Sequence, residues 1–277
     1  MMNAPATTLT LSPLGGLANR MRAILAADAL CRSLGIRLKI VWLKESGLNA
    51  RFCDLFQPLP IGEVEELSPF SSWGYVPPRK RNFFIPRLFQ SVRYDLCLFD
   101  HQLSTLQENP QKLVEVIKGK NVLIASGLCF FLVDDTLFSK YFIPQPSILE
   151  EVERRTASFD TQMVVGVHIR RTDNVQSIQY SPLDAFVKKM ESFPTAHFYV
   201  ATDDDQVKSF LVQKFPHRIL SSPSTADRTS LLGMREAVTE MYTLARTAYF
   251  LGSYYSSFSD IIIEMNGHGE TVVYKVE

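Results

Sequence analysis

The sequence predicts an α/β protein made of two domains, each built on a parallel β-sheet. Short β-favouring runs alternate with segments of helical periodicity along most of the chain. Such alternation is typical of parallel sheets that helices cover on both faces. A length of 277 residues leaves room for two domains, and a content of 46% hydrophobic and 21% charged residues indicates real cores.

The N-terminal half opens with a strand, a glycine turn and a helix. Residues 8–11 favour a strand, a Gly-Gly pair interrupts it, and residues 17–34 place apolar side chains at helical spacing. Gly35 ends the helix and residues 37–43 form the next strand, which completes a βαβ unit. Beyond a stretch rich in proline and aromatic residues, the expected elements are a strand at 94–99, a helix at 110–119 and a strand at 121–126.

The C-terminal half alternates more regularly. Pro144 and Pro146 precede it and mark the expected boundary between domains 1–145 and 146–277. The expected helices lie at 147–159, 183–192, 204–214, 229–247 and 257–266. The expected strands lie at 163–169, 197–201, 218–220, 248–252 and 271–275. Two α/β halves that meet at a cleft are the predicted architecture, with ligands at the carboxyl ends of the strands.

Charge, cysteine content and hydropathy exclude several classes of protein. The net charge is zero, so nothing favours nucleic acid as a partner. The four cysteines are far apart and form no CxxC pair, which indicates neither a zinc site nor a disulfide framework. The sequence has no signal-peptide pattern and no run of roughly 20 apolar residues. We therefore expect a cytoplasmic protein with at most peripheral membrane contact.

Residues 73–93 combine aromatic side chains with five basic residues. This composition suits docking on an anionic glycolipid or a membrane surface. The alternative, which the sequence alone favours, is a solvated loop held by prolines and a few core anchors.

Four polar segments follow predicted strands, and the first is HIRRTDN, residues 168–174. Strand alternation places His168 and Arg170 on one side and Arg171 and Asp173 on the other. Adjacent arginines at the carboxyl end of a strand suit an anion, because guanidinium groups make bidentate contacts with phosphate. The alternative is that Arg171 and Asp173 form a structural ion pair.

The second segment, ATDDD, places Asp203 and Asp204 directly after a strand. Paired carboxylates in this position can hold Mg²⁺ or Mn²⁺ against a diphosphate, as a DxD metal site does. Alternatively, one of them caps the helix that follows, and the segment taken by itself favours the cap.

The third segment is GSYYSSFSD, residues 252–260, between a strand and a helix. Ser256 and Ser257 would present hydroxyls and backbone N–H groups at a helix N-terminus, which suits phosphate. The fourth segment is LGGLANR at the first strand–helix turn, where the glycine pair by itself favours a structural use. Asn19 and Arg20 are the polar residues there that are best placed to reach into a cleft.

These segments resemble a known family in their order and approximate spacing. HIRRTD, ATDD, a helix with Arg235 and Glu240, and GSYYSSFSD are similar to the GDP-fucose-binding domain of fucosyltransferases. The likeness is to the α1,6-fucosyltransferases, including those that act on rhizobial Nod factors, and it extends to the α1,2- and protein O-fucosyltransferases. GGLANRM resembles the N-terminal motif of the same superfamily. The match covers residues 163–260 and 14–21 and is absent from 45–160.

The resemblance implies a GT-B-like fold of two Rossmann-like domains, with GDP-fucose bound by the C-terminal domain and the acceptor by the N-terminal one. It implies that Arg170 contacts the β-phosphate, that His168 lines the nucleotide pocket and that Glu240 binds the guanine. The other implied donor-binding residues are Arg171, Asn19, Asp203, Asp204, Arg235, Ser256, Ser257 and Phe258. No metal and no cofactor besides the donor substrate are implied.

The implied function is an inverting, metal-independent transfer of L-fucose from GDP-fucose to a hydroxyl of a glycan or glycolipid. In the α1,6 enzymes the suggested base is a glutamate shortly after HxRRxD, where this chain has Ile178. Asp173 is our candidate for the base, and the alternatives are Glu45, Asp54 or charge stabilisation alone. A glycosyltransferase for another nucleotide sugar and a non-catalytic sugar-nucleotide-binding module are the competing functions.

Overall fold

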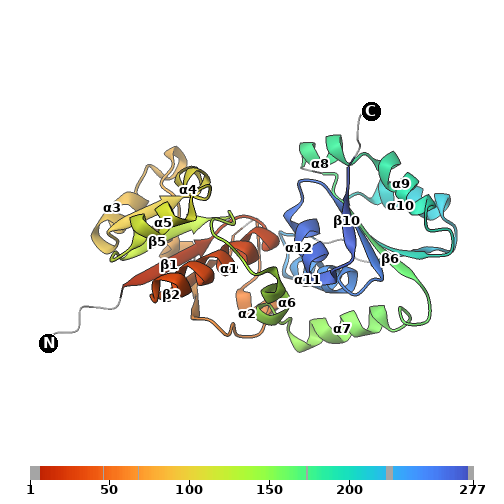
Figure 1. Ribbon diagram of the computed structural model, residues 1–277, viewed down its shortest axis with the longest axis horizontal. Coiled ribbons are helices and arrows are strands. Elements are labelled where there is room, and N and C mark those ends of the chain that lie inside the picture. Colours follow the sequence, from red (N-terminus) through yellow and green to blue (C-terminus); the bar gives the residue numbers. More distant parts are fainter. Residues whose placement is uncertain (1–6, 46, 68, 173, 223–226, 274–277) are drawn as a thin grey trace. The chain divides into compact units, whose positions relative to one another are not determined.

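The computed structural model describes residues 7–45, 47–67, 69–172, 174–222 and 227–273. The chain divides into two compact units, Met1–Ile143 and Pro144–Glu277, two residues before the expected boundary. Each unit contains a five-stranded parallel sheet with helices packed on it (Figure 1). The predicted α/β class with two Rossmann-like domains is thereby confirmed, while the expected cleft between them stays a prediction.

In the N-terminal unit the strand order is β3-β2-β1-β5-β4, and all neighbouring strands are parallel. The strands are β1 (Thr8–Pro13), β2 (Arg37–Leu43), β3 (Glu63–Leu67), β4 (Leu96–Phe99) and β5 (Val122–Ser126). The α-helices are α1 (Leu17–Leu34), α2 (Phe52–Leu55), α3 (Pro86–Arg93), α4 (Asp100–Leu106), α5 (Pro110–Ile117) and α6 (Phe138–Tyr141). The 3-10 helices are η1 (Pro69–Tyr75), η2 (Lys80–Asn82) and η3 (Asp135–Leu137). Ligands of such sheets bind at the switch point, which here lies between β1 and β5.

Alternation along β2 shows what covers the two faces of this sheet. The Trp42 ring lies 4.8 Å from the guanidinium of Arg20 in α1. Its neighbours Val41 and Leu43 point to the other face, where they pack with Tyr75 of η1 in a buried cluster. Part of the proline- and aromatic-rich stretch thus covers one face of the sheet.

In the C-terminal unit the strand order is β10-β9-β6-β7-β8, again with parallel neighbours. The strands are β6 (Val164–Ile169), β7 (His197–Thr202), β8 (Ile219–Leu220), β9 (Tyr249–Ser253) and β10 (Gly269–Val272). The helices are α7 (Pro146–Thr156), α8 (Val175–Tyr180), α9 (Leu183–Glu191), α10 (Asp205–Lys214), α11 (Leu231–Leu244) and α12 (Ser257–Asn266). The first strand, β6, is central and the chain extends from it to both sides, as in dinucleotide-binding folds, so the switch point lies between β6 and β9.

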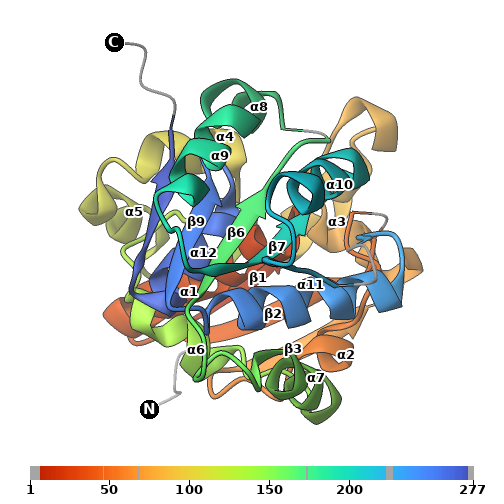
Figure 2. The same ribbon diagram turned by 90° about the vertical axis from the view of Figure 1, so that its right-hand side faces the viewer.

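Helices cover both faces of this second sheet (Figure 2). Buried apolar residues such as Val167 and Ile169 of β6 pack against α9 and α10. Alternation turns Gly166 and His168 to the opposite face, towards α11 and α12. Among the helices in the described part of the chain, none combines the length and the apolar character that crossing a bilayer requires.

Candidate functional site

Polar side chains from three strands come together at the carboxyl edge of the C-terminal sheet. His168 lies in β6 with Arg170 directly after it, Asp203 follows β7, and Ser253 ends β9. The Ser253 hydroxyl joins two of these segments, because it donates to the His168 carbonyl (3.1 Å) and accepts the Arg170 N–H (2.9 Å). The polar segments after β6 and β9 thus meet at the switch point.

The His168 ring is buried against α12. Its Nδ1 lies 2.8 Å from Ser259 Oγ, and its ring centroid lies 4.9 Å from that of Phe258. Ser259 Oγ accepts the Ser253 N–H at 3.0 Å, which favours a hydroxyl proton directed at Nδ1 and hence an N–H on Nε2. Burial, together with Arg170, lowers the pKa of His168 to about 4. The imidazole is therefore neutral near pH 7 and can donate a hydrogen bond without carrying charge.

Gly252 lets α12 approach β9 closely enough for this contact. A Cβ at this position would lie 2.8 Å from the Cβ of Ser259 and 2.9 Å from the Phe250 ring. Any other residue would push the helix outward and move Ser259 away from His168. The glycine after the buried part of β9 is therefore needed for the site as well as for the packing.

Asp203 organises the loop that follows β6. Its carboxylate accepts hydrogen bonds from the Arg171 N–H (2.7 Å), the Thr172 N–H (3.2 Å) and Thr172 Oγ1 (2.7 Å), and it pairs with Arg170 Nη1 at 2.7 Å. Burial alone would raise the pKa of Asp203, but the Thr172 hydrogen bond and the Arg170 charge lower it. Asp203 thus sets the direction of the Arg170 guanidinium.

Replacing Asp203 by asparagine is expected to destabilise the protein by about 2 kcal/mol at pH 7, because an ion pair and several charge-assisted hydrogen bonds weaken together. The pKa of Asp203 lies below its ordinary value of 3.8, so its contribution is present above that value and is lost as the pH falls through the folded-state pKa. Urea unfolding should show a difference from wild type that shrinks on acidification. Asp205→Asn, at an exposed position of the next helix, is the control, and a pH-independent difference for Asp203→Asn would contradict this assignment.

Two of the other predicted residues make structural contacts. Asp204 caps α10, since its Oδ1 accepts the Gln206 N–H at 2.8 Å, as the capping alternative predicts. The Arg171 guanidinium donates to the Ser181 carbonyl at 2.8 Å. Within the described residues, no three His, Cys, Asp or Glu side chains are grouped as a metal site would need. Donor binding by Asp204 and Arg171 stays a prediction.

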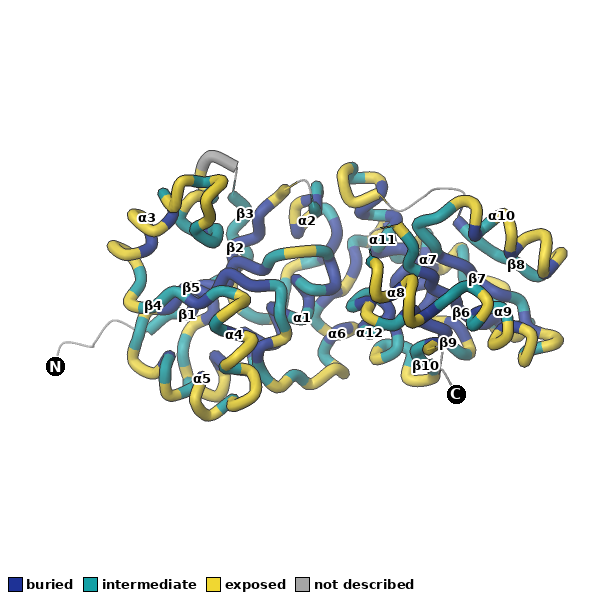
Figure 3. Tube along the Cα trace, turned by 90° about the horizontal axis from the view of Figure 1, so that it is seen from above, coloured by how far each residue is buried: buried dark blue, intermediate teal, exposed yellow. Residues whose placement is uncertain are grey.

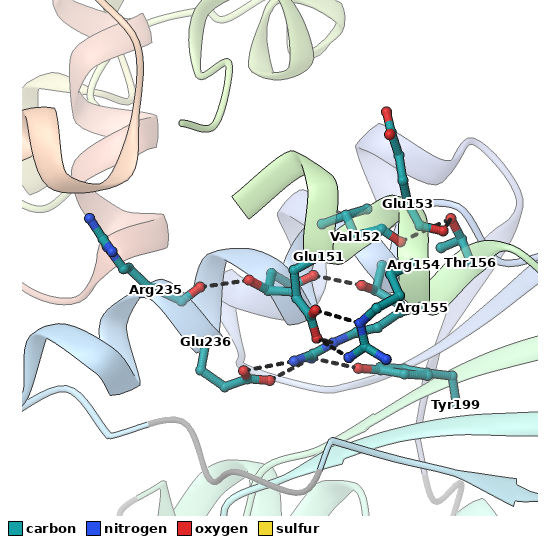
Figure 4. Close-up of polar contacts among 11 residues, drawn as sticks. Glu151, Val152, Glu153, Arg154, Arg155, Thr156, Tyr199, Arg235 and Glu236 are labelled. Carbon is teal, nitrogen blue, oxygen red and sulfur yellow. Dashed lines mark hydrogen bonds and ion pairs between the residues drawn. The ribbon is translucent and has the colours of Figure 1, made fainter. Parts of the chain in front are cut away.

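A buried ion pair holds α11 to α7 and to the sheet (Figure 4). Arg155 donates to both carboxylate oxygens of Glu236, at 2.6 and 2.9 Å, and to the Tyr199 hydroxyl at 3.0 Å. Breaking such a pair typically costs about 3–5 kcal/mol, because the remaining charge stays buried. Arg235 of the same helix points away from this cluster (Figure 4).

Glu240 lies one turn further along α11 and is a buried acid of a different kind. Its carboxyl has no hydrogen-bond partner among the residues that the structure describes, although it is only 8% exposed. Burial and the nearby Glu236 raise the pKa of Glu240 to about 8, against the opposing charges of Arg155 and Lys208. Once it loses its proton, this carboxyl offers two acceptor oxygens, which suit a ligand with two N–H groups.

The remaining predicted residues are divided among three places. Ser256 caps α12 and accepts the Ser259 N–H at 3.4 Å, and Ser257 begins that helix. Asn19 belongs to the N-terminal unit. Asp173 lies outside the described residues.

A pocket of about 550 Å³ lies at the switch point of the N-terminal sheet and is of a size typical for small-ligand sites. The turns after β1 and β5 line part of it and lie close together, since a Cβ on Gly127 would lie 2.7 Å from the Leu14 carbonyl oxygen. The lining residues are Leu14, Gly15, Asn19, Glu45, Ser72, Trp73, Val76, Pro77, Arg79, Arg81, Asn82, Asp100 and Gly127. Most of these residues come from the stretch without regular periodicity, so the sequence pattern did not predict them as lining a site.

Arg20 does not line this pocket, so the expectation that it reaches into a cleft is wrong. Its buried guanidinium donates to the carbonyls of Gly15 (2.9 Å) and Leu43 (2.6 Å) and to Glu45 Oε1 (2.6 Å). Burial lowers the pKa of Arg20 to about 10, which leaves it charged at neutral pH. Arg20 therefore positions Glu45, whose side chain is 43% exposed.

Comparison with known proteins gives a likeness of fold. Neither a protein-family model nor a curated protein sequence matches the chain. Among solved structures, NodZ α-1,6-fucosyltransferase of Bradyrhizobium, soaked with GDP-fucose, has a TM-score of 0.67 at 15% identity, over 94% of this chain and 92% of that chain.

Two further solved structures share the fold. FUT1 of Arabidopsis thaliana, a variant in complex with GDP, has a TM-score of 0.62 at 14% identity, over 100% of this chain and 72% of that chain. POFUT1 in its apo form has a TM-score of 0.57 at 13% identity, over 98% of this chain and 99% of that chain. The chain therefore has a GT-B-like α/β fold similar to that of these enzymes.

Proposed function

We propose that this protein is a glycosyltransferase that moves L-fucose from GDP-fucose to a hydroxyl of a glycan or glycolipid. The observation that carries the proposal is the C-terminal switch point, which gathers an oriented arginine, a neutral histidine and a helix N-terminus. Folds of this type hold a diphosphate at that position. The similar structures support the proposal, since they are named as fucosyltransferases and two of them contain GDP-fucose or GDP.

The charges of the site suit a departing diphosphate. In fucosyl transfer the sugar carbon gains oxocarbenium character while GDP gains negative charge. Arg170, directed by Asp203, would stabilise that charge at the β-phosphate. The N-terminus of α12, with Ser256 and Ser257, would add backbone N–H groups. We therefore propose an inverting reaction that proceeds without a metal ion.

Glu240 is our candidate for recognition of the base. Guanine presents an N1–H and an amino group on one edge, and a carboxylate accepts both at once. Uracil offers only one such N–H, so a site built on this contact distinguishes GDP from UDP.

The pocket of the N-terminal unit is our candidate for the acceptor site. Trp73 offers an aromatic surface on which a sugar ring can pack, and Asn19, Glu45 and Asp100 offer hydrogen bonds to hydroxyls. These groups suit a neutral carbohydrate, which forms many hydrogen bonds and has apolar faces.

The base that activates the acceptor hydroxyl can be identified by replacing carboxylates one at a time. The variant that lacks the base should lose roughly 10²–10⁴-fold in kcat and keep its affinity for GDP. The candidates are Asp173 and Glu45, tested as Asp173→Asn and Glu45→Gln. Asp54→Asn is the control, because both Asp54 oxygens are bound to Arg51 in a helix cap. Near wild-type kcat in both test variants would favour charge stabilisation alone.

Calorimetric titration with GDP, GDP-fucose and UDP, each with and without EDTA, tests the proposed donor. Micromolar binding of GDP and GDP-fucose that is unaffected by EDTA, together with much weaker binding of UDP, is the expected result. Equal binding of UDP would favour a transferase for another nucleotide sugar. Loss of GDP binding in EDTA would reject metal independence, and GDP binding without transfer to any acceptor would favour a non-catalytic module.

A further inference from the structure

The segment of residues 79–93, which contains η2 and α3 and is here named the docking segment, carries large apolar side chains on its surface. Figure 3 shows most of α3 as exposed. The most exposed apolar residues of the docking segment are Phe83 (81%), Leu88 (70%), Phe89 (55%) and Val92 (89%). Single exposed apolar residues are normal, but several within one short segment mark an interaction surface.

The orientation of α3 is the reverse of that of an ordinary surface helix. Its buried residues are Pro86 and Gln90, and the Gln90 side chain donates to the Val76 carbonyl at 2.8 Å. Leu88 and Val92, one turn apart, lie on the outer side. A helix that covers a sheet normally turns its apolar stripe inward, so the attachment of α3 leaves that stripe free for a different partner.

The turn before α3 holds two aromatic rings. Phe83 and Phe84 both have left-handed backbone angles, with φ of 51° and 56°, which bulky residues rarely adopt. Phe84 is 42% exposed, and the Arg87 guanidinium lies 5.3 Å from its ring centroid. The turn thus holds aromatic rings and a cation together at the surface.

The charge of the docking segment indicates what covers it. The segment contains no acidic residue, and its basic residues are Arg79, Lys80, Arg81, Arg87 and Arg93. In strand β3, which precedes the segment in the chain, Glu65 pairs with Lys39 and Glu66 accepts the Cys53 N–H, so protein partners already bind these two carboxylates. The protein as a whole has a net charge of zero, and this concentration of positive charge is therefore local.

We propose that the docking segment binds the surface of an anionic phospholipid bilayer. Phe83, Leu88, Phe89 and Val92 enter the boundary between headgroups and acyl chains, while Lys80 and Arg87 contact lipid phosphates. Apolar and basic side chains on one short amphipathic helix are the combination that lies in a membrane interface. A purely apolar protein partner would not require cations such as Lys80 and Arg87 beside the exposed apolar side chains.

Co-sedimentation with vesicles tests this proposal on the full chain, without nucleotide or acceptor. The protein should bind phosphatidylcholine vesicles that contain phosphatidylglycerol, bind pure phosphatidylcholine weakly, and dissociate at high salt. Lys80→Gln combined with Arg87→Gln should lower the partition coefficient roughly 25-fold, from about fivefold for each cation near the surface. Phe83→Ser combined with Leu88→Ser and Val92→Ser should lower it at least about tenfold, because apolar insertion is lost.

Matched variants separate this surface from general effects. Lys112→Gln with Lys118→Gln removes two exposed cations, one in α5 and one directly after it, and should leave binding unchanged, as should Leu132→Ser at another exposed apolar position. Circular dichroism should show that all variants are folded. Equal binding to neutral and anionic vesicles, or no binding to either, would overturn the proposal. So would a dimer that the triple serine variant converts to a monomer without any vesicle binding, since a second copy of the chain would then cover the segment.

Discussion

Replacement of Arg170 by alanine is expected to lower the rate of fucosyl transfer by roughly 10²–10³-fold or more and to leave the fold intact. The loss follows from the role proposed for its guanidinium, which stabilises charge on GDP more strongly in the transition state than in the bound substrate. Asp203 would keep its hydrogen bonds from Arg171 and Thr172, so the loop after β6 should hold its shape. Transfer of fucose to an acceptor measures the rate, and circular dichroism measures the fold.

The adjacent arginine provides the matched comparison. The Arg171 guanidinium donates to the Ser181 carbonyl, so Arg171→Ala should reduce stability by about 1 kcal/mol and affect transfer much less than Arg170→Ala. Arg170→Lys keeps the charge but loses the planar fork, and it should recover only part of the rate. Near wild-type transfer by Arg170→Ala, or a larger loss in Arg171→Ala, would mean that the roles of the two residues are wrongly assigned.

The C-terminal unit could be predicted well from the sequence because its elements are buried on regular faces. The helix expected at 257–266 is Ser257–Asn266, and the strand expected at 163–169 is Val164–Ile169. In β6 every residue is buried, and apolar runs of this length between turn residues are a clear strand signal. The helix expected at 229–247 is shorter, Leu231–Leu244, because Ser230 caps its start.

The middle of the N-terminal unit was harder for physical reasons that the structure makes clear. Strand β3 has the sequence EVEEL, whose charges argue against a strand, and it is stabilised by pairing with β2 and by an ion pair from Lys39 to Glu65. Helix α3 turns its apolar stripe outward, so the spacing of its apolar residues does not indicate which face of the helix packs against the protein. Both depend on contacts that local sequence does not contain.

The position of the candidate site could be predicted, but the contacts and role of each side chain could not. The ends of β6, β7 and β9 are where polar segments follow strands, and the topology brings them together. Asp203 looked like a metal ligand or a helix cap, whereas its carboxylate binds a loop about 30 residues earlier in the chain, at Thr172. Arg20 looked like a ligand contact, whereas it is buried beneath Glu45. Such roles depend on partners distant in sequence.

Binding of GDP is expected to release a proton from Glu240 and to strengthen as the pH rises from 6 to 8. The pKa of Glu240 is raised to about 8, so its carboxyl is mostly protonated at neutral pH before the ligand binds. The N1–H and the amino group of guanine are both hydrogen-bond donors, so they bind the carboxylate form of Glu240 and not its protonated form. The apparent affinity should therefore increase by up to about tenfold for each pH unit below the free-state pKa. Calorimetry in buffers of different ionisation enthalpy measures the proton released.

The variant Glu240→Gln separates this role from a structural one, because the two effects have opposite signs. GDP affinity should fall roughly 10²-fold and lose its pH dependence, since hydrogen bonds to a charged acceptor are the stronger ones.

The stability of Glu240→Gln should change in the other direction. The unfolded chain releases the Glu240 proton near 4.5 and the folded chain only near 8, so this residue makes wild type progressively less stable as the pH rises between those values. Glu240→Gln should therefore be the more stable protein at pH 8, with the difference vanishing below about pH 4.5. Glu153→Gln, at an exposed position of α7, should change neither property. If GDP and UDP lost affinity equally while the variant unfolded more easily at pH 8, Glu240 would be a structural residue and the guanine assignment would fail.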